Sequence, residues 1–444
     1  MRAPALARDA AKVTAQDVTA RLVPSAERPV DLAQLHDRVV ETIEKHFHDE
    51  ALLKRLDWRA LAAAARPQIV SAQTLADAAR HINALLARLE TSHTALYTPD
   101  DVEYYILLDV VGASASTELL ATRFWGSGPA YAGIGAFTVQ LGERHFVDAV
   151  LEGSPADRAG LEFGDEIVEV DGEPYSPIAA FRGKAGRTAT LRVRHAEATM
   201  LDTIGVQVAT ILPKKAFADA TRASARIIER GGKRIGYVHL WASVDSAPLR
   251  EALGVLNPGI ELEQVRRSDG RAEAVFHPAP HNRSGPARLV DGLIIDARGK
   301  VGGRAGVPTE YLEMIDPSPR RVRMTARARD GSERASQTVS FKGRSALLID
   351  KKTRSAVEIL AHAFKRDRIG PLIGTTTAGA VTAGGGFIMP GELYLYVGVT
   401  GLSFDGERLE GKGVAPDIRV ERPLPYAGGA DPVLEAALKQ IAGD

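Results

Sequence analysis

The stretch SALLIDKKTRSAVEILAHAFKRDRIGPLIG, residues 345–374, decides the fold class of this chain. It opens with SALLID, a short apolar run of strand length. A helical run follows from Ser355 to about Lys365, and a second apolar run begins at Pro371. Strands that alternate with helices are typical of an α/β core, so the sequence predicts that architecture here.

The same alternation extends from Lys233 to the end of the chain. Further apolar strands are expected at RIGYVHLW (234–241), LVDGLIIDARG (289–299) and ELYLYVGVT (392–400). Residues 256–287 interrupt the pattern with a segment rich in Pro, Arg and Asp, which predicts a long surface loop. We therefore place an α/β core over residues 213–444.

Toward the N-terminus the pattern changes to helix. Apolar residues recur at three- and four-residue intervals between Asp31 and Leu89, which predicts several amphipathic helices. We assign residues 31–126 to a helical N-terminal domain. Residues 1–30 have no strong period and predict a loose N-terminal arm without chemistry.

Residues 127–212, between these two parts, are β-rich, with strand-like stretches separated by Gly and Pro. Ser154 and Pro155 fit the N-cap and first turn of a short helix that Gly160 ends. Asp171-Gly172 is a strong signal for a two-residue hairpin turn. The sequence thus predicts an α/β multidomain chain with a helical N-terminal domain, a β-rich domain and an α/β core.

The composition excludes several kinds of site. With 444 residues the chain can bury a large core without cross-links. It has no cysteine, which rules out a thiol nucleophile, cysteine-ligated zinc and disulfides. Lys plus Arg and Asp plus Glu are 56 each, so no net charge favours binding to nucleic acid. No run is long enough to span a membrane, and the opening MRAPALARDAAKV has too short an apolar stretch for a signal peptide.

Within the β-rich part, SPADRAGLEFGDEIVEVDGEPY, residues 154–175, closely resembles the carboxyl half of a PDZ domain of bacterial proteases. The resemblance implies a PDZ-like module that accepts a peptide as an added strand and holds its terminal carboxylate with backbone N–H groups. The corresponding loop is AGIGAF, residues 132–137, so Gly133, Ile134 and Gly135 are candidate peptide-binding residues. The alternative is that both glycines only form a tight strand turn.

Four further segments resemble, in order, the C-terminal processing (tail-specific) serine peptidases and the related tricorn core. They are TSHTALYTPDD (91–101), DARGKVGG (296–303), TRSAVEILAHAF (353–364) and GKGVAPDI (411–418). The resemblance implies a crotonase-like peptidase core and a serine endopeptidase that uses no metal or cofactor. It also implies protein or peptide substrates, a possible homo-oligomer, no stable membrane insertion, and a periplasmic or secreted location.

By this resemblance Ser355 is the nucleophile, because the catalytic serine of the family lies three residues before a glutamate, as Ser355 lies before Glu358. A helix N-terminus also supplies N–H groups and positive potential where an oxyanion would form. The alternative is a capping box, in which Ser355 only satisfies an N–H group of its own helix.

DARGKVGG resembles the family's loop that donates N–H groups to the oxyanion, with Lys300-Val301 in place of Asn-Pro. We expect the oxyanion hole to form from Gly302 or Gly303 together with the N–H of Ala356. The alternative is a glycine turn that only ends a strand.

The base is the point at which this chain departs from most of the family. The position that resembles the family's catalytic lysine is Ala380, so another group must activate the serine. The tricorn branch, which the chain resembles more closely, uses a Ser-His pair and a glutamate, here Ser92, His93 and Glu410. His93 would take the proton from Ser355, Ser92 would orient the imidazole, and Glu410 would polarise Ser92. Such a base predicts a rate that rises through a pKa near 6 to 7.

These assignments have competitors in the sequence. His93 sits on a loop just past a helix and could instead cap that helix. Glu407 or Asp405 could take the place of Glu410 after a slip in register, or Glu410 could be a solvated turn carboxylate. His239, on an expected strand, is an alternative base.

Two histidine pairs, His46/His48 and His277/His281, have spacing compatible with a metal ion but no third ligand, so we predict no metal site. Two other functions compete with a peptidase. One is a catalytically inactive PDZ-containing peptide-binding or scaffold protein, and the other is a protein that handles acyl-CoA or a small ligand.

Overall fold

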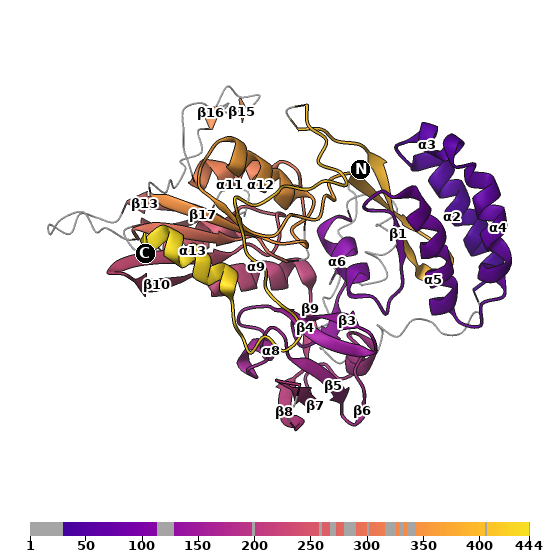
Figure 1. Cartoon of the computed structure of the whole chain (residues 1–444), viewed down its shortest axis with the longest axis horizontal. Coiled ribbons are helices and arrows are strands. Elements are labelled where there is room, and N and C mark those ends of the chain that lie inside the picture. The colour runs from indigo at the N-terminus through magenta and orange to yellow at the C-terminus, as the bar shows by residue number, and fades with distance from the viewer. Residues whose placement is uncertain are drawn as a thin grey trace, which may run out of the picture.

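The computed structural model of this chain describes residues 30–112, 128–197, 200–256, 260–266, 272–278, 290–299, 302–315, 326–327, 333–334, 343–404 and 406–443. The arm expected before residue 30 lies outside these ranges, as do Lys300 and Val301. Figure 1 shows a stack of helices, a small β-rich unit and a larger unit of sheet and helices. This arrangement confirms the predicted α/β multidomain architecture.

The helical part begins with capped helices. Asp31, Asp49 and Thr74 accept hydrogen bonds from first-turn N–H groups, as expected for N-cap residues. The elements are α2 (Leu32–His46), α3 (Glu50–Arg55), α4 (Trp58–Val70), α5 (Leu75–Leu86), the 3-10 turn η1 (Ala87–Leu89) and, farther on, α6 (Val102–Val110).

A three-stranded sheet from both halves of the chain completes the core of these helices. Strand β20 (Tyr394–Thr400) pairs antiparallel with β1 (Ala95–Tyr97) on one side and with β19 (Ala383–Ile388) on the other. Leu395 of β20 is buried in the same cluster as Leu35 of α2. The region expected to be a helical domain therefore has a core that the C-terminal part of the chain completes.

The β-rich part is a six-stranded antiparallel sheet in the order β3-β4-β5-β7-β8, with β6 beside β5. Its elements are β2 (Tyr131–Gly133), β3 (Ala136–Leu141), β4 (Arg144–Val150), α8 (Pro155–Arg158), β5 (Glu166–Val170), β6 (Glu173–Pro174), η2 (Ala179–Phe181), β7 (Thr188–Arg194), β8 (Asp202–Gln207) and β9 (Ala209–Ile211). Strands β2 and β9 pair with each other, where the chain enters and leaves this unit.

Two local predictions in this unit are confirmed. Ser154 caps α8, with its Oγ accepting a hydrogen bond from the N–H of Asp157 at 3.2 Å. Asp171 and Gly172 connect β5 to β6 with positive φ angles of 54° and 85°, as a tight hairpin turn requires.

The core unit contains a second six-stranded sheet, in the order β10-β11-β14-β17-β18-β21. All neighbouring pairs are parallel except β10 with β11. Its elements are α9 (Pro213–Ser224), β10 (Arg226–Arg230), β11 (Lys233–His239), α10 (Ala247–Leu256), β14 (Gly292–Asp296), α11 (Val307–Ile315), β17 (Arg344–Ile349), α12 (Ala356–Arg366), β18 (Leu372–Gly374), η3 (Pro390–Glu392), β21 (Ile418–Arg419) and α13 (Pro432–Ala442). Two short strands, β15 (Ala326–Arg327) and β16 (Glu333–Arg334), also pair.

Helices cover both faces of this sheet, because successive residues of its strands point to opposite sides. Leu347 of β17 packs in a cluster with Leu360 of α12, whereas the next residue, Leu348, packs in a cluster with Leu438 of α13. All of these side chains are buried. This double cover explains why the central strands are continuous apolar runs instead of alternating ones.

The prediction of a long loop over residues 256–287 is wrong in part. The segment contains two strands, β12 (Ile260–Arg266) and β13 (Ala272–Pro278), which pair antiparallel. The sequence Ile-Glu-Leu-Glu at the start of β12 already alternates with the period of a strand. The Pro, Arg and Asp content of the segment instead favoured the prediction of a loop. The side chain of His277 and all of His281 lie outside the described residues.

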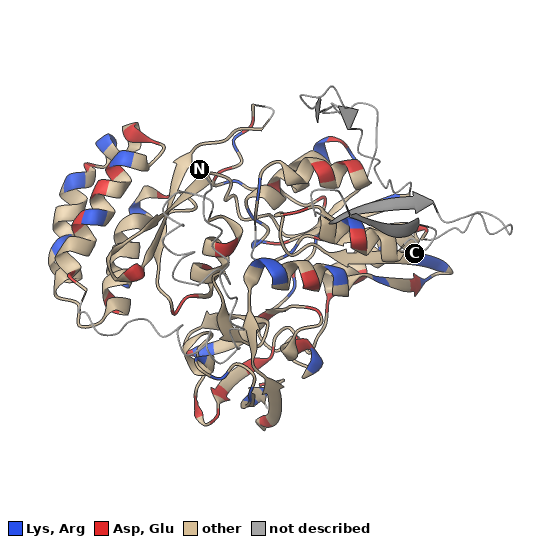
Figure 2. Cartoon of the chain, turned by 180° about the vertical axis from the view of Figure 1, so that it is seen from behind, with Lys and Arg blue, Asp and Glu red and all other residues tan. Residues whose placement is uncertain are grey.

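Surface charge is mixed in the part of the chain that the structure describes. Figure 2 shows Lys and Arg interspersed with Asp and Glu over the helices, which agrees with equal totals of 56. In the same ranges, no helix is both long and apolar enough to cross a membrane.

Candidate active site

The candidate catalytic residues gather at one edge of the core sheet. Because β11, β14, β17 and β18 are parallel, their carboxyl ends face the same edge. The loop after β14 carries Gly302 and Gly303, the turn after β17 carries Ser355, and the segment after β18 carries Ala380. Sheet topology therefore brings together segments that are far apart in the sequence.

Ser355 is the N-cap of α12 and has a backbone conformation that side chains rarely adopt. Its φ is 57° and its ψ is −128°, whereas an ordinary N-cap is extended. Its N–H donates to the carbonyl of Ala380 at 2.9 Å and to the carboxylate of Glu358 at 3.1 Å. Glu358 thus acts in the capping box that the sequence predicts. A cap alone does not require this strained turn, which is typical of a nucleophile held between a strand and a helix.

Glu358 is completely buried and ties the nucleophile turn to the segment after β18. Its carboxylate accepts hydrogen bonds from the Thr377 hydroxyl at 2.6 Å and from the N–H groups of Gly379 and Ala380 at 2.7 Å each. Burial raises the pKa of Glu358 above its ordinary value. Ala380, at the position that resembles the family's catalytic lysine, therefore binds Glu358 through its backbone N–H.

The turn that leads to Ser355 is built by Asp350. Its Oδ1 accepts hydrogen bonds from the N–H groups of Lys352 and Thr353, both at 2.9 Å. The Thr353 hydroxyl donates to the carbonyl of Ala297 at 2.8 Å. This bond connects the turn before Ser355 to the start of the glycine loop.

Gly302 and Gly303 lie beside the nucleophile turn. A Cβ on Gly302 would overlap the Cβ of Ser355 and lie 2.8 Å from its Oγ, so only glycine fits there. Gly303 has a φ of 150° and packs against the carbonyl of Ser243. The N–H groups of Gly302, Gly303 and Ala356 have no hydrogen-bond acceptor among the described residues. They are therefore available to an oxyanion.

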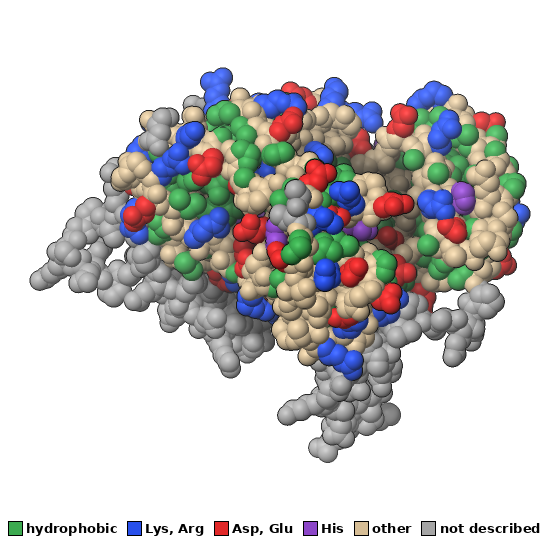
Figure 3. Space-filling view, turned by 60° about the horizontal axis from the view of Figure 1, so that its bottom comes forward, with side chains coloured by type: hydrophobic (Ala, Val, Ile, Leu, Met, Phe, Trp, Pro, Cys, Tyr) green, Lys and Arg blue, Asp and Glu red, His purple; other side chains and the backbone are tan. Residues whose placement is uncertain are grey.

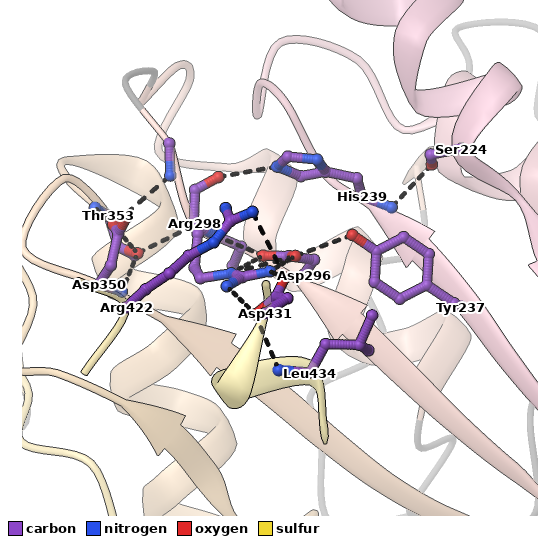
Figure 4. Close-up of polar contacts among 12 residues, drawn as sticks. Ser224, Tyr237, His239, Asp296, Arg298, Asp350, Thr353, Arg422, Asp431 and Leu434 are labelled. Carbon is purple, nitrogen blue, oxygen red and sulfur yellow. Dashed lines mark hydrogen bonds and ion pairs between the residues drawn. The ribbon is translucent and has the colours of Figure 1, made fainter. Parts of the chain in front are cut away.

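A buried ion-pair network lies at the end of β14, which precedes the glycine loop in the chain, and Figure 4 shows its residues. The Arg298 guanidinium donates to Asp296 at 2.9 Å and to Asp431 at 2.8 Å, and the Tyr237 hydroxyl donates to Asp296 at 2.8 Å. Burial would raise the pKa of Asp296, but the charges of Arg298 and His239 outweigh it and hold that pKa far below its ordinary value. The Asp-Ala-Arg sequence thus stabilises the base of the loop.

His93 lies on the loop between η1 and β1, with a positive φ of 56° and a buried imidazole. Its Nδ1 is 2.5 Å from the carbonyl oxygen of Thr382 and 3.5 Å from the Ser92 Oγ. A carbonyl accepts only, so Nδ1 carries the proton and Nε2 keeps its lone pair. The Thr382 carbonyl, and not Ser92 as expected, makes the close contact that orients the ring. No motif in the sequence pointed to Thr382.

Glu410 binds the two segments that position His93. One carboxylate oxygen accepts from the Ser92 hydroxyl at 3.0 Å and from the N–H groups of Val381 and Thr382 at 2.8 Å each, and the other accepts from the Ser92 N–H at 2.8 Å. Burial would raise the pKa of Glu410, but the hydrogen bonds from Ser92 and Thr382 outweigh it and lower that pKa. The structure brings Glu410 to Ser92, as expected, and makes it a clamp between two loops.

The imidazole of His93 is a weakly basic group in this site. Burial lowers its pKa, and the positive charge of Arg354 lowers it further. Together they outweigh the opposing effects of Thr382 and Glu410 and leave the pKa at about 4. The ring is therefore neutral at neutral pH and able to accept a proton through Nε2.

Ser355, His93, Gly302 and Gly303 line a single cavity of about 240 Å³. Among the described residues, the His93 ring forms hydrogen bonds to Thr382 and Ser92. Ser355 Oγ and His93 Nε2 are therefore not hydrogen-bonded to each other in this structure. Catalytic hydrogen bonds often tighten only with substrate in place. Figure 3 shows a hollow between the helical part and the rest of the molecule, on the side of the β-rich unit.

His239, the alternative base, does not line this cavity. Its Nδ1 is 2.9 Å from the Glu152 carboxylate and its Nε2 is 2.9 Å from the Arg298 carbonyl oxygen. Burial lowers the pKa of His239, but the charges of Glu152 and Asp296 outweigh it and raise that pKa to about 9. A doubly protonated ring with both nitrogens engaged cannot act as a base, so this alternative is disfavoured.

The candidate peptide-binding residues lie where β2 passes into β3. Gly133 ends β2, and Ile134 is buried in the core of the β-rich unit. Gly135 has a φ of 81°, and a Cβ there would overlap Ser154. Among the described strands β3 is at the edge of its sheet, the position at which an added strand would pair.

Of the remaining alternatives, those that the structure describes do not line the cavity. Glu407 is exposed, and Asp405 lies outside the described residues. His46 and His48 are half-buried on and just after α2. No cluster of His, Asp and Glu suited to a metal ion occurs within the described ranges.

Comparison with known families identifies two regions. Residues 271–420 match Peptidase family S41, and residues 146–194 match the PDZ domain. The first match includes Gly302, Ser355 and Glu410, whereas His93 lies outside it.

Two relatives extend the similarity beyond these regions. The chain is 25% identical over 441 residues to a tricorn protease homolog of Streptomyces coelicolor, an alignment that covers 94% of this chain and 33% of that relative. It is 23% identical over 313 residues to the carboxy-terminal processing protease CtpB of Bacillus subtilis, which covers 67% of this chain and 57% of that relative. The chain thus spans only part of the length of both relatives.

Among solved structures, the crystal structure of the tricorn protease has a TM-score of 0.51 and a sequence identity of 19%. The alignment covers 94% of this chain and 37% of that chain. At this level of identity the likeness supports the fold.

Proposed function

We propose that this chain, which carries a peptidase S41 domain and a PDZ domain, is a serine endopeptidase that cleaves unfolded or C-terminal protein segments through an acyl-enzyme. The observation that carries the proposal is the single cavity lined by Ser355, His93 and Gly302. These residues come from three distant segments. Backbone hydrogen bonds join Ser355 to Ala380 and Gly302 to Ser243, and the Thr382 carbonyl contacts the His93 ring.

In the proposed mechanism, Ser355 Oγ attacks the peptide carbonyl and its proton passes to His93 Nε2. The N–H groups of Gly302, Gly303 and Ala356 stabilise the oxyanion. His93 then protonates the leaving amine, and a water molecule hydrolyses the acyl-enzyme with His93 again as base. No step requires a metal or cofactor.

Supporting roles fall to residues that do not touch the reacting atoms. The Thr382 carbonyl orients the imidazole through Nδ1, and Glu410 and Ser92 hold the two loops together.

We propose functional units over 31–126, 127–212 and 213–444, with the first sharing β19 and β20 of the last. The PDZ-like unit would present peptides through the backbone around Gly133, Ile134 and Gly135, as an added strand on β3.

The test measures hydrolysis of an unfolded protein by the wild type, Ser355→Ala and His93→Ala, with labelling of the serine by a fluorophosphonate. His46→Ala is a matched control, because His46 is half-buried and lies outside the cavity. Both site variants are expected to lose about a thousandfold or more in rate, since triad members act as a unit. The control should keep wild-type activity.

Other outcomes would contradict specific parts of the proposed function. Equal hydrolysis by all variants would dismiss the mechanism, and a wild type that neither labels nor hydrolyses would leave a peptide-binding protein. Loss only in Ser355→Ala would point to a different base, such as Lys351, which lines the same cavity. A periplasmic or secreted location and a homo-oligomer stay predictions, which cell fractionation and light scattering would test.

A further inference from the structure

Arg354, the residue immediately before the candidate nucleophile, places a positive charge in the catalytic cavity. It is half-buried and lines the cavity together with His93 and Ser355. Tyr97 and Tyr396 line the same cavity. Burial lowers the pKa of His93 and the charge of Arg354 lowers it further, whereas burial raises the pKa of Tyr97 and Tyr396 and the charge of Arg354 opposes that rise. No ion pair links Arg354 to a carboxylate in the described part of the chain.

The other charges of the cavity do not cancel this one. Lys351 and Lys352 also line it, and Glu103 of α6 is the sole acidic residue among its described walls. Lys352 is already paired with Asp148 of the β-rich unit. The cavity thus presents a cationic side, with Arg354 nearest to the nucleophile in the chain.

Much of the remaining cavity wall is apolar. Ile106, Leu107 and Val110 of α6 line the cavity, and Tyr97 and Tyr396 add aromatic surface. A side chain with an aliphatic stem and an anionic end would contact both the apolar wall and the guanidinium, which binds carboxylates well. Glutamate has this form.

We propose that Arg354 makes this cavity selective for substrates that carry a carboxylate next to the scissile bond. The carboxylate belongs to an acidic side chain or to the chain terminus, and both would pair with the same guanidinium. The proposal rests on the peptidase function proposed above and adds the substrate class.

A consequence for catalysis follows from the position of the charge. In the empty site Arg354 opposes protonation of His93, which is the step that a general base must perform. A substrate carboxylate paired with Arg354 neutralises that charge, so the imidazole becomes a stronger base when the preferred substrate is bound. Selectivity should therefore appear in kcat as well as in KM.

The experiment compares three peptides that differ only at the residue before the scissile bond or at the end of the chain. One has an internal Glu and an amidated terminus, the second has Gln and the same amide, and the third has Gln and a free carboxylate directly after the scissile residue pair. The wild type should cleave the Glu or the free-acid peptide about 10- to 100-fold better in kcat/KM than the Gln amide. A preference for the Glu peptide would show that Arg354 recognises an acidic side chain. A preference for the free-acid peptide would show that it recognises the terminal carboxylate.

Arg354→Gln should remove that preference, so that it cleaves the Glu amide, the Gln amide and the free-acid peptide with similar kcat/KM. Arg354→Glu should instead favour a peptide with Lys at the same position. Arg88→Gln is the matched control, because Arg88 is exposed on η1 and does not line the cavity. Fluorophosphonate labelling of each variant verifies that the site is folded. If a variant fails to fold, loss of the wild-type preference at high salt supplies the same test, since salt screens a charge pair.

Equal rates of the wild type on all three peptides would overturn the inference and leave the peptidase function standing. A preference that survives in Arg354→Gln would also overturn it. Absence of hydrolysis of every peptide by the wild type, with no labelling of Ser355, would instead reject the proposed function itself.

Discussion

At the scale of single residues, the two groups proposed to exchange a proton are both in strained backbone. Ser355 has a φ of 57° and His93 a φ of 56°. Such conformations cost about 1–3 kcal/mol each and persist only where the surroundings impose them. Here the surroundings are Glu358 and Ala380 around the serine, and Thr382 around the histidine.

Replacement of Ser355 by glycine should stabilise the fold even though it removes the nucleophile. Glycine adopts positive φ without strain and replaces an N-cap serine at a cost of only a few tenths of a kcal/mol. We expect Ser355→Gly to raise the free energy of unfolding by about 1 kcal/mol relative to Ser355→Ala, which keeps the strain. Urea unfolding of both variants measures the difference. Equal stabilities would mean that the turn relaxes without cost.

The pH dependence of the reaction should reflect the environment of His93 and not that of a solvated histidine. The sequence alone predicts a rate that rises through 6 to 7, but burial and Arg354 lower the pKa of His93 to about 4. The neutral ring is the active form, so kcat/KM should fall as the pH drops through about 4 and be level above it.

Arg354→Gln should move this acid limb to higher pH, because one of the two causes of the low pKa is removed. A limb at 6 to 7 in both proteins would contradict the assigned environment. A profile that requires pH above 9 would favour a lysine as the base.

At the scale of elements, the site depends on how closely loops at the carboxyl edge of the sheet approach each other. Gly302→Ala would place its methyl group on the side chain of Ser355. We expect kcat to fall by about a hundredfold or more, since an oxyanion-hole donor and the nucleophile both shift. Gly306→Ala is the matched control, because nothing lies within 4 Å of its Cβ position. Similar activity in both variants would contradict the assigned oxyanion loop.

The clamp formed by Glu410 gives a second test at this scale. An amide in Glu410→Gln would turn an NH₂ group toward the N–H donors of Ser92, Val381 or Thr382, which repel it. The loops should separate slightly and the rate should fall about 10- to 100-fold without loss of fold. Glu407→Gln, at an exposed position in the same segment, should have no effect. If Glu407→Gln lowered the rate and Glu410→Gln did not, Glu407 would take the role assigned to Glu410.

At the scale of the whole molecule, one acidic residue in strand β4 of the PDZ-like unit and one just after it make charged contacts with the core unit. Glu152 binds His239 at 2.9 Å and also accepts from the indole N–H of Trp241 at 2.5 Å. Asp148 pairs with Lys352, a few residues before Ser355. The β-rich unit therefore contacts the end of β11 and the turn before Ser355.

The Glu152–His239 pair should make the fold less stable at alkaline pH. The pKa of His239 is raised from an ordinary 6.5 to about 9, so the protonated ring favours the folded state. That contribution, on the order of 3 kcal/mol, is complete below about pH 6.5 and is lost as the pH rises through about 9. Unfolding free energies between pH 6 and 10 measure it.

Glu152→Gln should flatten this dependence, because it removes one of the two charges that raise the pKa of His239, the other being Asp296. Glu173→Gln, at an exposed position of the same unit, should leave it unchanged. An unchanged slope in Glu152→Gln would mean that the buried histidine is neutral in the folded protein.

The sequence by itself determined the alternation of strands and helices, the capped turn at Ser355, and the glycines that must lie close to other backbone. These features depend on neighbours within a few residues, so local spacing records them. The pairing of Ser92 with Glu410 was also accessible, but only through resemblance to a family.

Only the tertiary structure decided that Thr382 orients His93, that Arg354 and burial weaken this base, and that β19 and β20 complete the N-terminal core. Each of these depends on a backbone carbonyl, a desolvated charge or an apolar face supplied by a segment far away in the chain. Such partners have no sequence signal of their own, because a carbonyl is present in every residue and burial is a property of the packed molecule.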